Sequence, residues 1–90
     1  MENQELHLAR GDAAKSLLKT EAFQAVTNEL VNAYMGQIVQ SEPAQTAERE
    51  RCYAGIKAVQ DLVGLLNTWI GVAVQARMQA EAQADESTDD

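Results

Sequence analysis

The chain has 90 residues, of which 46% are hydrophobic and 23% charged, and its formal net charge is −7. A chain of this length buries only about 60–65% of its unfolded surface, and its composition is typical of one small soluble domain. These numbers argue against a two-domain enzyme. The apolar runs are far shorter than the roughly 20 residues of a membrane span, and the single cysteine, Cys52, forms no internal disulfide and fits a reducing compartment.

Residues 1–11 are polar and contain no signal or transit sequence, so we expect a polar N-terminal arm. Gly11 indicates a break, and Asp12 is a candidate N-cap for a short helix over residues 12–19. Thr20 is either a second cap or an ordinary helical residue. The sequence therefore leaves open whether the short helix continues into the next one.

A long helix is predicted over residues 20–40. Its apolar side chains recur at steps of three and four, which places them on one helical face. These residues are Phe23, Val26, Leu30, Ala33, Tyr34 and Ile38. We assign Tyr34, together with Ile56, to the intramolecular core.

A turn is predicted over residues 41–46 because it contains the only proline, Pro43, which cannot continue a helix. Thr46 is a candidate N-cap, and a second long helix should cover residues 47–80. Two long helices joined by so short a link indicate an antiparallel helical hairpin over residues 12–78. The predicted fold class is therefore all-α, with a short N-terminal helix preceding the hairpin.

The second long helix carries more apolar surface than one neighbour can cover. Its apolar residues span an arc of about 200°, whereas packing against one helix needs about 100°. The stretch from Trp69 to Met78 would also project beyond the hairpin unless the N-terminal helix or another copy covers it. We therefore predict self-association into a helical bundle. The candidate interface residues are Leu62, Leu65, Leu66, Trp69, Ile70 and Val72.

Gly64, Thr68 and Gly71 lie on one side of the same helix. They form either a groove that lets another helix approach closely or tolerated weak points on an exposed side, since each glycine costs about 0.8–1 kcal/mol relative to alanine.

Most of the negative charge lies in residues 79–90, which hold five of the 14 acids and no base. We expect this segment to be a disordered acidic tail. Residues 1–78 then carry nine acids and seven bases. No basic stripe is present, which disfavours direct nucleic-acid binding.

Catalytic and metal-binding residue sets are absent, so we predict no enzyme activity, no cofactor and no metal site. The lone His7 is expected to be a solvated surface residue. The tripeptide Arg10-Gly11-Asp12 matches a cell-adhesion motif. We interpret this match as a coincidence, because Asp12 is the predicted helix N-cap. The alternating charges over residues 48–51 are either a docking patch or a solvated helix start, and Cys52 is expected to be a free, half-buried thiol, with a bridge between two copies as the alternative.

Several segments together resemble small bacteriophage proteins of this length, encoded among structural or packaging genes. The segments begin with Ala13-Ala14-Lys15-Ser16-Leu17-Leu18 and continue with Phe23-Gln24-Ala25-Val26, Leu30 and Tyr34. They end with Ser41-Glu42-Pro43, Glu48-Arg49-Glu50, Tyr53, Ile56, Val59 and Leu66. The resemblance implies a helical hairpin and a non-enzymatic viral role. The chain departs from it at Cys52, where a larger apolar residue is expected, and in the apolar stretch around Trp69.

Three functions follow as hypotheses. The first is a phage-encoded virion assembly or packaging accessory protein that binds itself and a larger phage or host protein, in the host cytoplasm or on the virion. The second is an inhibitor or adaptor of a host protein whose acidic tail mimics nucleic acid. The third is a small DNA-packaging subunit, which would need copies that gather Arg10, Lys15 and Lys19 on one rim.

Overall fold

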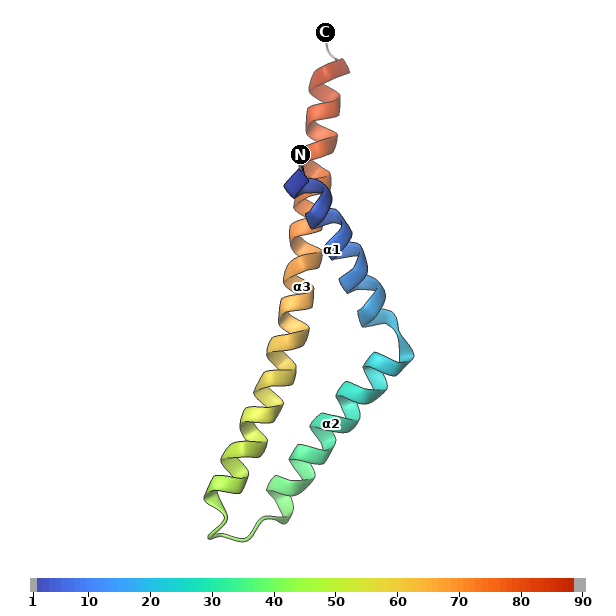
Figure 1. Cartoon of the computed structure of the whole chain (residues 1–90). Helices are drawn as coiled ribbons and strands as arrows, with labels where there is room; N and C mark the ends of the chain where they lie inside the picture. The colour runs from blue at the N-terminus through green and yellow to red at the C-terminus, as the bar shows by residue number, and fades with distance from the viewer. Residues whose placement is uncertain (1, 89–90) are drawn as a thin grey trace. The chain divides into compact units, whose positions relative to one another are not determined.

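A computed structural model describes the backbone of residues 2–88 and the side-chain burial of residues 3–84. This part of the chain consists of three α-helices, α1 (Glu2–Lys19), α2 (Glu21–Gln40) and α3 (Thr46–Thr88), and contains no strand (Figure 1). The predicted all-α class is therefore confirmed.

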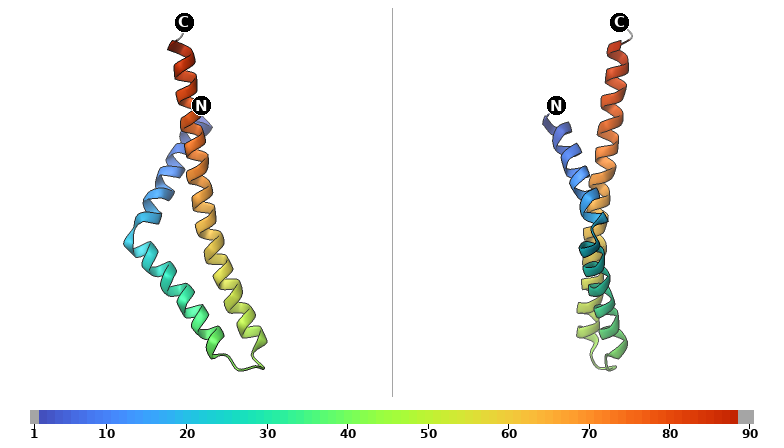
Figure 2. Two further views of the ribbon diagram at one scale, coloured as in Figure 1. Left: turned by 180° about the vertical axis from the view of Figure 1, so that it is seen from behind. Right: turned by 90° about the vertical axis from the view of Figure 1, so that its right-hand side faces the viewer.

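The chain divides into two compact units. The first, which we call the α1 unit, combines the residues up to Leu18 with those from Leu65 onward, so that α1 packs against the C-terminal half of α3. The second, the α2 unit, comprises residues 19–64 and packs α2 against the N-terminal half of α3. Figure 2 shows the helices of each unit from two further sides.

Helix α1 begins at Glu2, so the prediction of a polar arm over residues 1–11 and of a cap at Asp12 is wrong. Gly11 is buried inside this helix, where an added Cβ would overlap Ala73 of α3. A glycine costs about 1 kcal/mol in a helix, but its missing side chain allows two helices to approach closely. The tertiary contact therefore explains a residue that local preference reads as a break.

Thr20 separates α1 from α2, which answers the question that the sequence left open. Its backbone is extended, with φ −69° and ψ 137°, and its side-chain oxygen accepts a hydrogen bond from the Phe23 amide at 3.3 Å. A threonine in this geometry satisfies one of the amides that a helix start leaves without a partner. Thr20 is therefore an N-cap.

The α2 unit is held by contacts that follow one another along both helices. Arg49 of α3 bonds Ser41, the Cys52 thiol donates to Gln37, and Gly55 lies against the Tyr34 ring. As the residue number falls along α2, it rises along α3. These contacts join residues 34–41 to residues 49–55.

Arg49 organises the link between α2 and α3. Its guanidinium donates to Ser41 Oγ at 3.1 Å, to the Glu42 carbonyl at 2.7 Å and to the Pro43 carbonyl at 3.1 Å. It also bonds Thr46 Oγ1 at 3.3 Å. Neither sequence interpretation of residues 48–51 describes this half-buried residue, because its hydrogen bonds are made within the chain.

Replacing Arg49 with glutamine should lower the free energy of unfolding by about 1–3 kcal/mol, because the turn carbonyls lose their charged donor. Urea denaturation followed by circular dichroism measures the change. Arg51→Gln is the matched control, since it removes a mainly exposed ion pair with Glu48 at 2.8 Å, worth about 0–1 kcal/mol, and one exposed hydrogen bond to Gln37, but no contact with the turn. Equal effects of the two substitutions would contradict the role given to Arg49.

The core of the α1 unit is built mainly from small residues. Ala14, Leu66, Ala73 and Ala76 are its buried apolar side chains, with exposed fractions of 2 to 8%. Two polar contacts flank this core: the Gln4 side chain donates to the Ala76 carbonyl at 2.7 Å, and Arg77 pairs with Asp12 at 2.8 Å. The small side chains let α1 cross α3 closely.

Helix α3 continues to Thr88, so the predicted helix end near Ala80 and the predicted disordered tail over residues 79–90 are not what the structure shows over residues 79–88. Residues 89 and 90 lie outside the described residues. Alanine, glutamine and glutamate dominate the start of this segment, and all three favour helix despite the net negative charge. The prediction of disorder followed from the negative charge of this segment, whereas the helix propensity of its residues favours the helix that the structure shows.

Candidate protein-interaction surface

Large apolar side chains are mostly exposed in the described part of the chain. The buried apolar residues are Ala14, Cys52, Leu66, Ala73 and Ala76, so leucine 66 is the one large aliphatic side chain among them. The large apolar side chains with an exposed fraction of 36% or more are Leu6, Leu17, Val26, Leu30, Met35, Val39, Tyr53, Leu62, Leu65, Trp69, Val72, Val74 and Met78. The helices therefore share little apolar core with one another.

The six residues predicted as an interface separate into two groups. Leu66 is 8% exposed and belongs to the core of the α1 unit, and Ile70 is half-buried. The other four remain exposed. They are Leu62, Leu65, Trp69 and Val72. Leu66 is removed from the candidate surface because it is buried, which the sequence pattern alone did not indicate.

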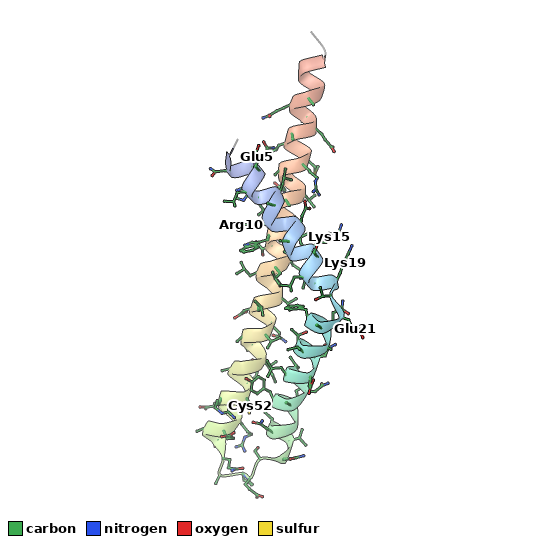
Figure 3. All side chains as sticks on the ribbon, turned by 45° about the vertical axis from the view of Figure 1, so that its right-hand side comes forward. Glu5, Arg10, Lys15, Lys19, Glu21 and Cys52 are labelled. Carbon is green, nitrogen blue, oxygen red and sulfur yellow. The ribbon has the colours of Figure 1, made fainter. Side chains whose placement is uncertain are left out.

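Helix α1 also covers part of Trp69. The guanidinium of Arg10 lies 5.4 Å from the centroid of the indole ring, a cation–π geometry worth about 0.5–1 kcal/mol at an exposed site. Figure 3 labels Arg10 on α1. Trp69 nevertheless keeps 36% of its surface exposed. The stretch beyond Trp69 is thus covered in part by the N-terminal helix, which was one of the two expected ways to cover it.

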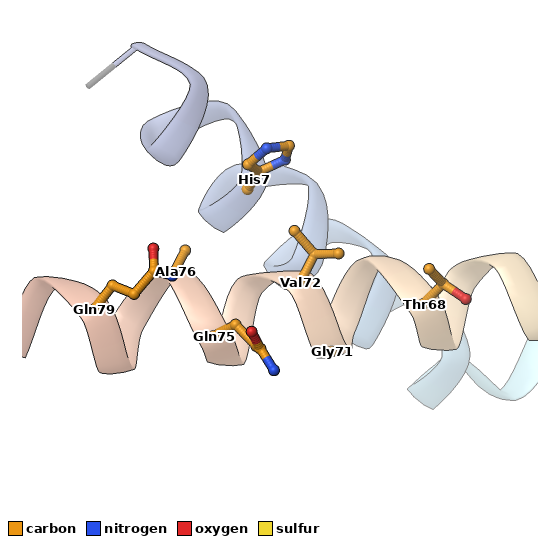
Figure 4. Close-up of a pocket in the computed structure, with 7 residues that line it drawn as sticks. All are labelled: His7, Thr68, Gly71, Val72, Gln75, Ala76 and Gln79. Carbon is orange, nitrogen blue, oxygen red and sulfur yellow. The ribbon is translucent and has the colours of Figure 1, made fainter.

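A groove runs between α1 and α3 within the α1 unit. One hollow of about 260 Å³ is lined by His7, Arg10, Leu65, Thr68, Trp69 and Val72. A second hollow of about 440 Å³ shares His7, Thr68 and Val72 with the first and extends past Gly71, Gln75 and Ala76 to Gln79 (Figure 4). We call these two hollows together the α1–α3 groove. His7 is half-buried and lines both hollows.

The predicted small-residue groove is open in this structure. Among the described residues, a Cβ added at Gly64 or Gly71 would meet nothing within 4 Å. Gly71 and Thr68 line the α1–α3 groove, whereas Gly64 belongs to the α2 unit. Both interpretations of these glycines therefore remain predictions.

The glycines that allow close approach are Gly11 and Gly55, and the sequence analysis missed both. A Cβ at Gly55 would lie 2.5 Å from Cζ of the Tyr34 ring. For Gly11 a signal was present, because Gly11 and Ala14 on one helix and Ala73 and Ala76 on the other repeat small residues at a spacing of three. Small residues at helical spacing mark a narrow face on which two helices can meet.

Cys52 is fully buried, with an exposed fraction of 0%, rather than half-buried as expected. Its thiol donates to the Gln37 side-chain oxygen at 3.1 Å, and the same oxygen accepts a hydrogen bond from Arg51 at 3.1 Å. The hydrogen bond to Glu48 raises the pKa of Arg51 above its ordinary value, so the guanidinium that donates to Gln37 is charged. A buried thiol in this position is not available to bridge two copies.

The cell-adhesion tripeptide lies within α1 and is used for packing. Arg10 stacks on Trp69, Gly11 contacts Ala73 and Asp12 pairs with Arg77. The tripeptide thus has a structural explanation that is unrelated to its predicted helix cap.

The two residues assigned to the intramolecular core, Tyr34 and Ile56, are half-buried.

Metal-binding and membrane-spanning features were sought in the same described residues. No group of three or more His, Cys, Asp or Glu side chains lies close enough to hold a metal ion. None of the helices combines the length and the apolar character that crossing a bilayer requires. The arrangement that stands out is therefore the exposed apolar surface and its groove.

Comparison with models of protein families, with curated proteins and with solved structures gives no significant match for this chain.

Proposed function

We propose that this protein is a non-enzymatic helical interaction module that self-associates through the apolar surface of α3 and docks on a larger protein. In this proposal α2 and the N-terminal half of α3 act as an antiparallel hairpin. One observation carries the proposal: among residues 3–84, thirteen large apolar side chains are exposed, whereas Leu66 is the one large aliphatic residue that is buried. Exposed apolar surface on this scale is characteristic of interaction sites.

We further propose, from the resemblance to small phage proteins alone, that the larger protein is a virion or packaging component. The module would then act as an assembly accessory protein in the host cytoplasm or on the virion. The polar and acidic end of α3 keeps such a module dispersed before assembly, because like charges repel.

Light scattering coupled to size exclusion tests the self-association. We expect a mass that is a multiple of 9.8 kDa and that falls on dilution as the equilibrium shifts to the single chain. A helical, cooperatively unfolding species that stays at 9.8 kDa at every concentration would overturn the proposal.

A further inference from the structure

We propose that the α1–α3 groove is the self-association site and that a second copy closes it with the same groove. The two α1–α3 pairs would then form a four-helix arrangement about a two-fold axis. This inference rests on the proposed function, because it names the partner and the surface of that self-association.

The groove has the form that receives a helix. Its α3 side presents Leu65, Thr68, Val72, Gln75 and Gln79, which follow one another at steps of three and four. Such spacing places them in one row along the helix, and rows of this kind pack against the row of another helix. His7 and Arg10 line the groove from α1. The residues of the α3 row and those of α1 therefore line a groove that can accommodate another helix.

The charge distribution favours a second copy over a charged partner. From Leu65 to Ala76 the chain carries no Asp, Glu, Lys or Arg. Beside this stretch Arg77 pairs with Asp12, whereas Arg10 keeps its positive charge over the Trp69 ring on the α1 side of the groove. In a two-fold contact each group meets a copy of the same surface, so any unpaired charge would meet its like. An uncharged row avoids that repulsion.

The exposed apolar area is placed where such a contact needs it. Leu65 is 54% exposed, Trp69 36% and Val72 38%, and all three line one hollow. A partly exposed tryptophan is a suitable anchor, because tryptophan is enriched among the residues that contribute most to the energy of protein interfaces. The apolar centre and the polar Gln75 and Gln79 at one end match the usual division of an interface into core and rim.

Charge introduction into the groove tests the inference. Val72→Glu should raise the dissociation constant of the self-associated species by about 100-fold or more, because the contact would bury an unpaired charge. Sedimentation over a dilution series measures it, and circular dichroism shows that the helices persist. Val39→Glu is the matched control: Val39 lies in α2 and is 83% exposed, so its dissociation constant should stay within about threefold of the unsubstituted value.

A second variant keeps the test independent of folding. Gln75→Lys changes an exposed polar residue of the groove to another good helix former, and we again expect weaker association. If Val72→Glu and Gln75→Lys both associate as tightly as the unsubstituted chain, the groove is not the site, although the self-association stands. If instead the unsubstituted chain is a monomer at every concentration, the proposed function fails and this inference fails with it.

Discussion

Replacing Gly11 with alanine is expected to lower the free energy of unfolding of the α1 unit by about 1–3 kcal/mol, the usual range for overpacking a close contact. The new Cβ would overlap the Cβ of Ala73 and lie 3.0 Å from the Trp69 carbonyl oxygen. The Trp69 oxygen is a backbone atom of α3 and the Ala73 Cβ is bonded directly to that backbone, so neither can move without moving the helix. The two helices must separate.

Tryptophan fluorescence and chemical denaturation at fixed protein concentration measure this effect. Trp69 is the only tryptophan of the chain and lies beneath Arg10 of α1, so its emission reports the contact. We expect the emission of Gly11→Ala to shift towards longer wavelength before global unfolding, as α1 separates from the indole ring.

Gly36→Ala is the matched control, because the same substitution there meets nothing within 4 Å and Gly36 lies in α2, outside the α1–α3 groove. It should raise the free energy of unfolding by about 0.5–1 kcal/mol, since alanine favours helix over glycine. Combining Gly11→Ala with Ala73→Gly should recover part of the loss by removing the overlapping Cβ. Stabilisation by Gly11→Ala of the same size as that by Gly36→Ala would refute the close approach of the two helices.

The second large effect is expected at Gly55. A Cβ there would lie 2.5 Å from Cζ, 2.6 Å from Cε2 and 3.0 Å from Cε1 of Tyr34, so the whole face of the ring must shift. Gly55→Ala should therefore lower the free energy of unfolding by about 1–2 kcal/mol, as overpacking outweighs the gain in helix propensity. Denaturation followed by circular dichroism provides the measurement.

A change of sign distinguishes this contact from a general effect of the substitution. In a chain that carries Tyr34→Leu, the ring is absent and Gly55→Ala should become stabilising by up to about 1 kcal/mol. If Gly55→Ala has the same effect in both backgrounds, the Tyr34 ring does not lie on Gly55. This double-mutant cycle needs no assumption about the stability of Tyr34→Leu alone.

Features that depend on a few neighbouring residues are those that sequence reasoning handled well. The all-α class follows from composition and from apolar residues at steps of three and four. Around Pro43 the backbone chemistry is local, because proline removes a donor and restricts the residue before it. The end of α2 at Gln40 and the start of α3 at Thr46 lie on either side of this segment.

Features that depend on contacts between distant residues were missed or misread. Gly11 has the local character of a break, but Ala73 stands more than sixty positions away and makes it a packing residue. Arg49 looked like part of a charged run, and its four turn partners became visible only in three dimensions. No pattern of spacing predicts that Gln37 accepts from Cys52.

The candidate surface shows the same division. The amino-acid sequence alone determined that α3 carries more apolar residues than one neighbouring helix can cover, because periodicity counts the residues on each side of a helix. Only the tertiary structure decided which of them are buried: Leu66 is, whereas Leu65, Trp69 and Val72 line a groove. The physical reason is that burial is a property of pairs of surfaces, and which surfaces meet depends on close approach at residues such as Gly11 and Ala73.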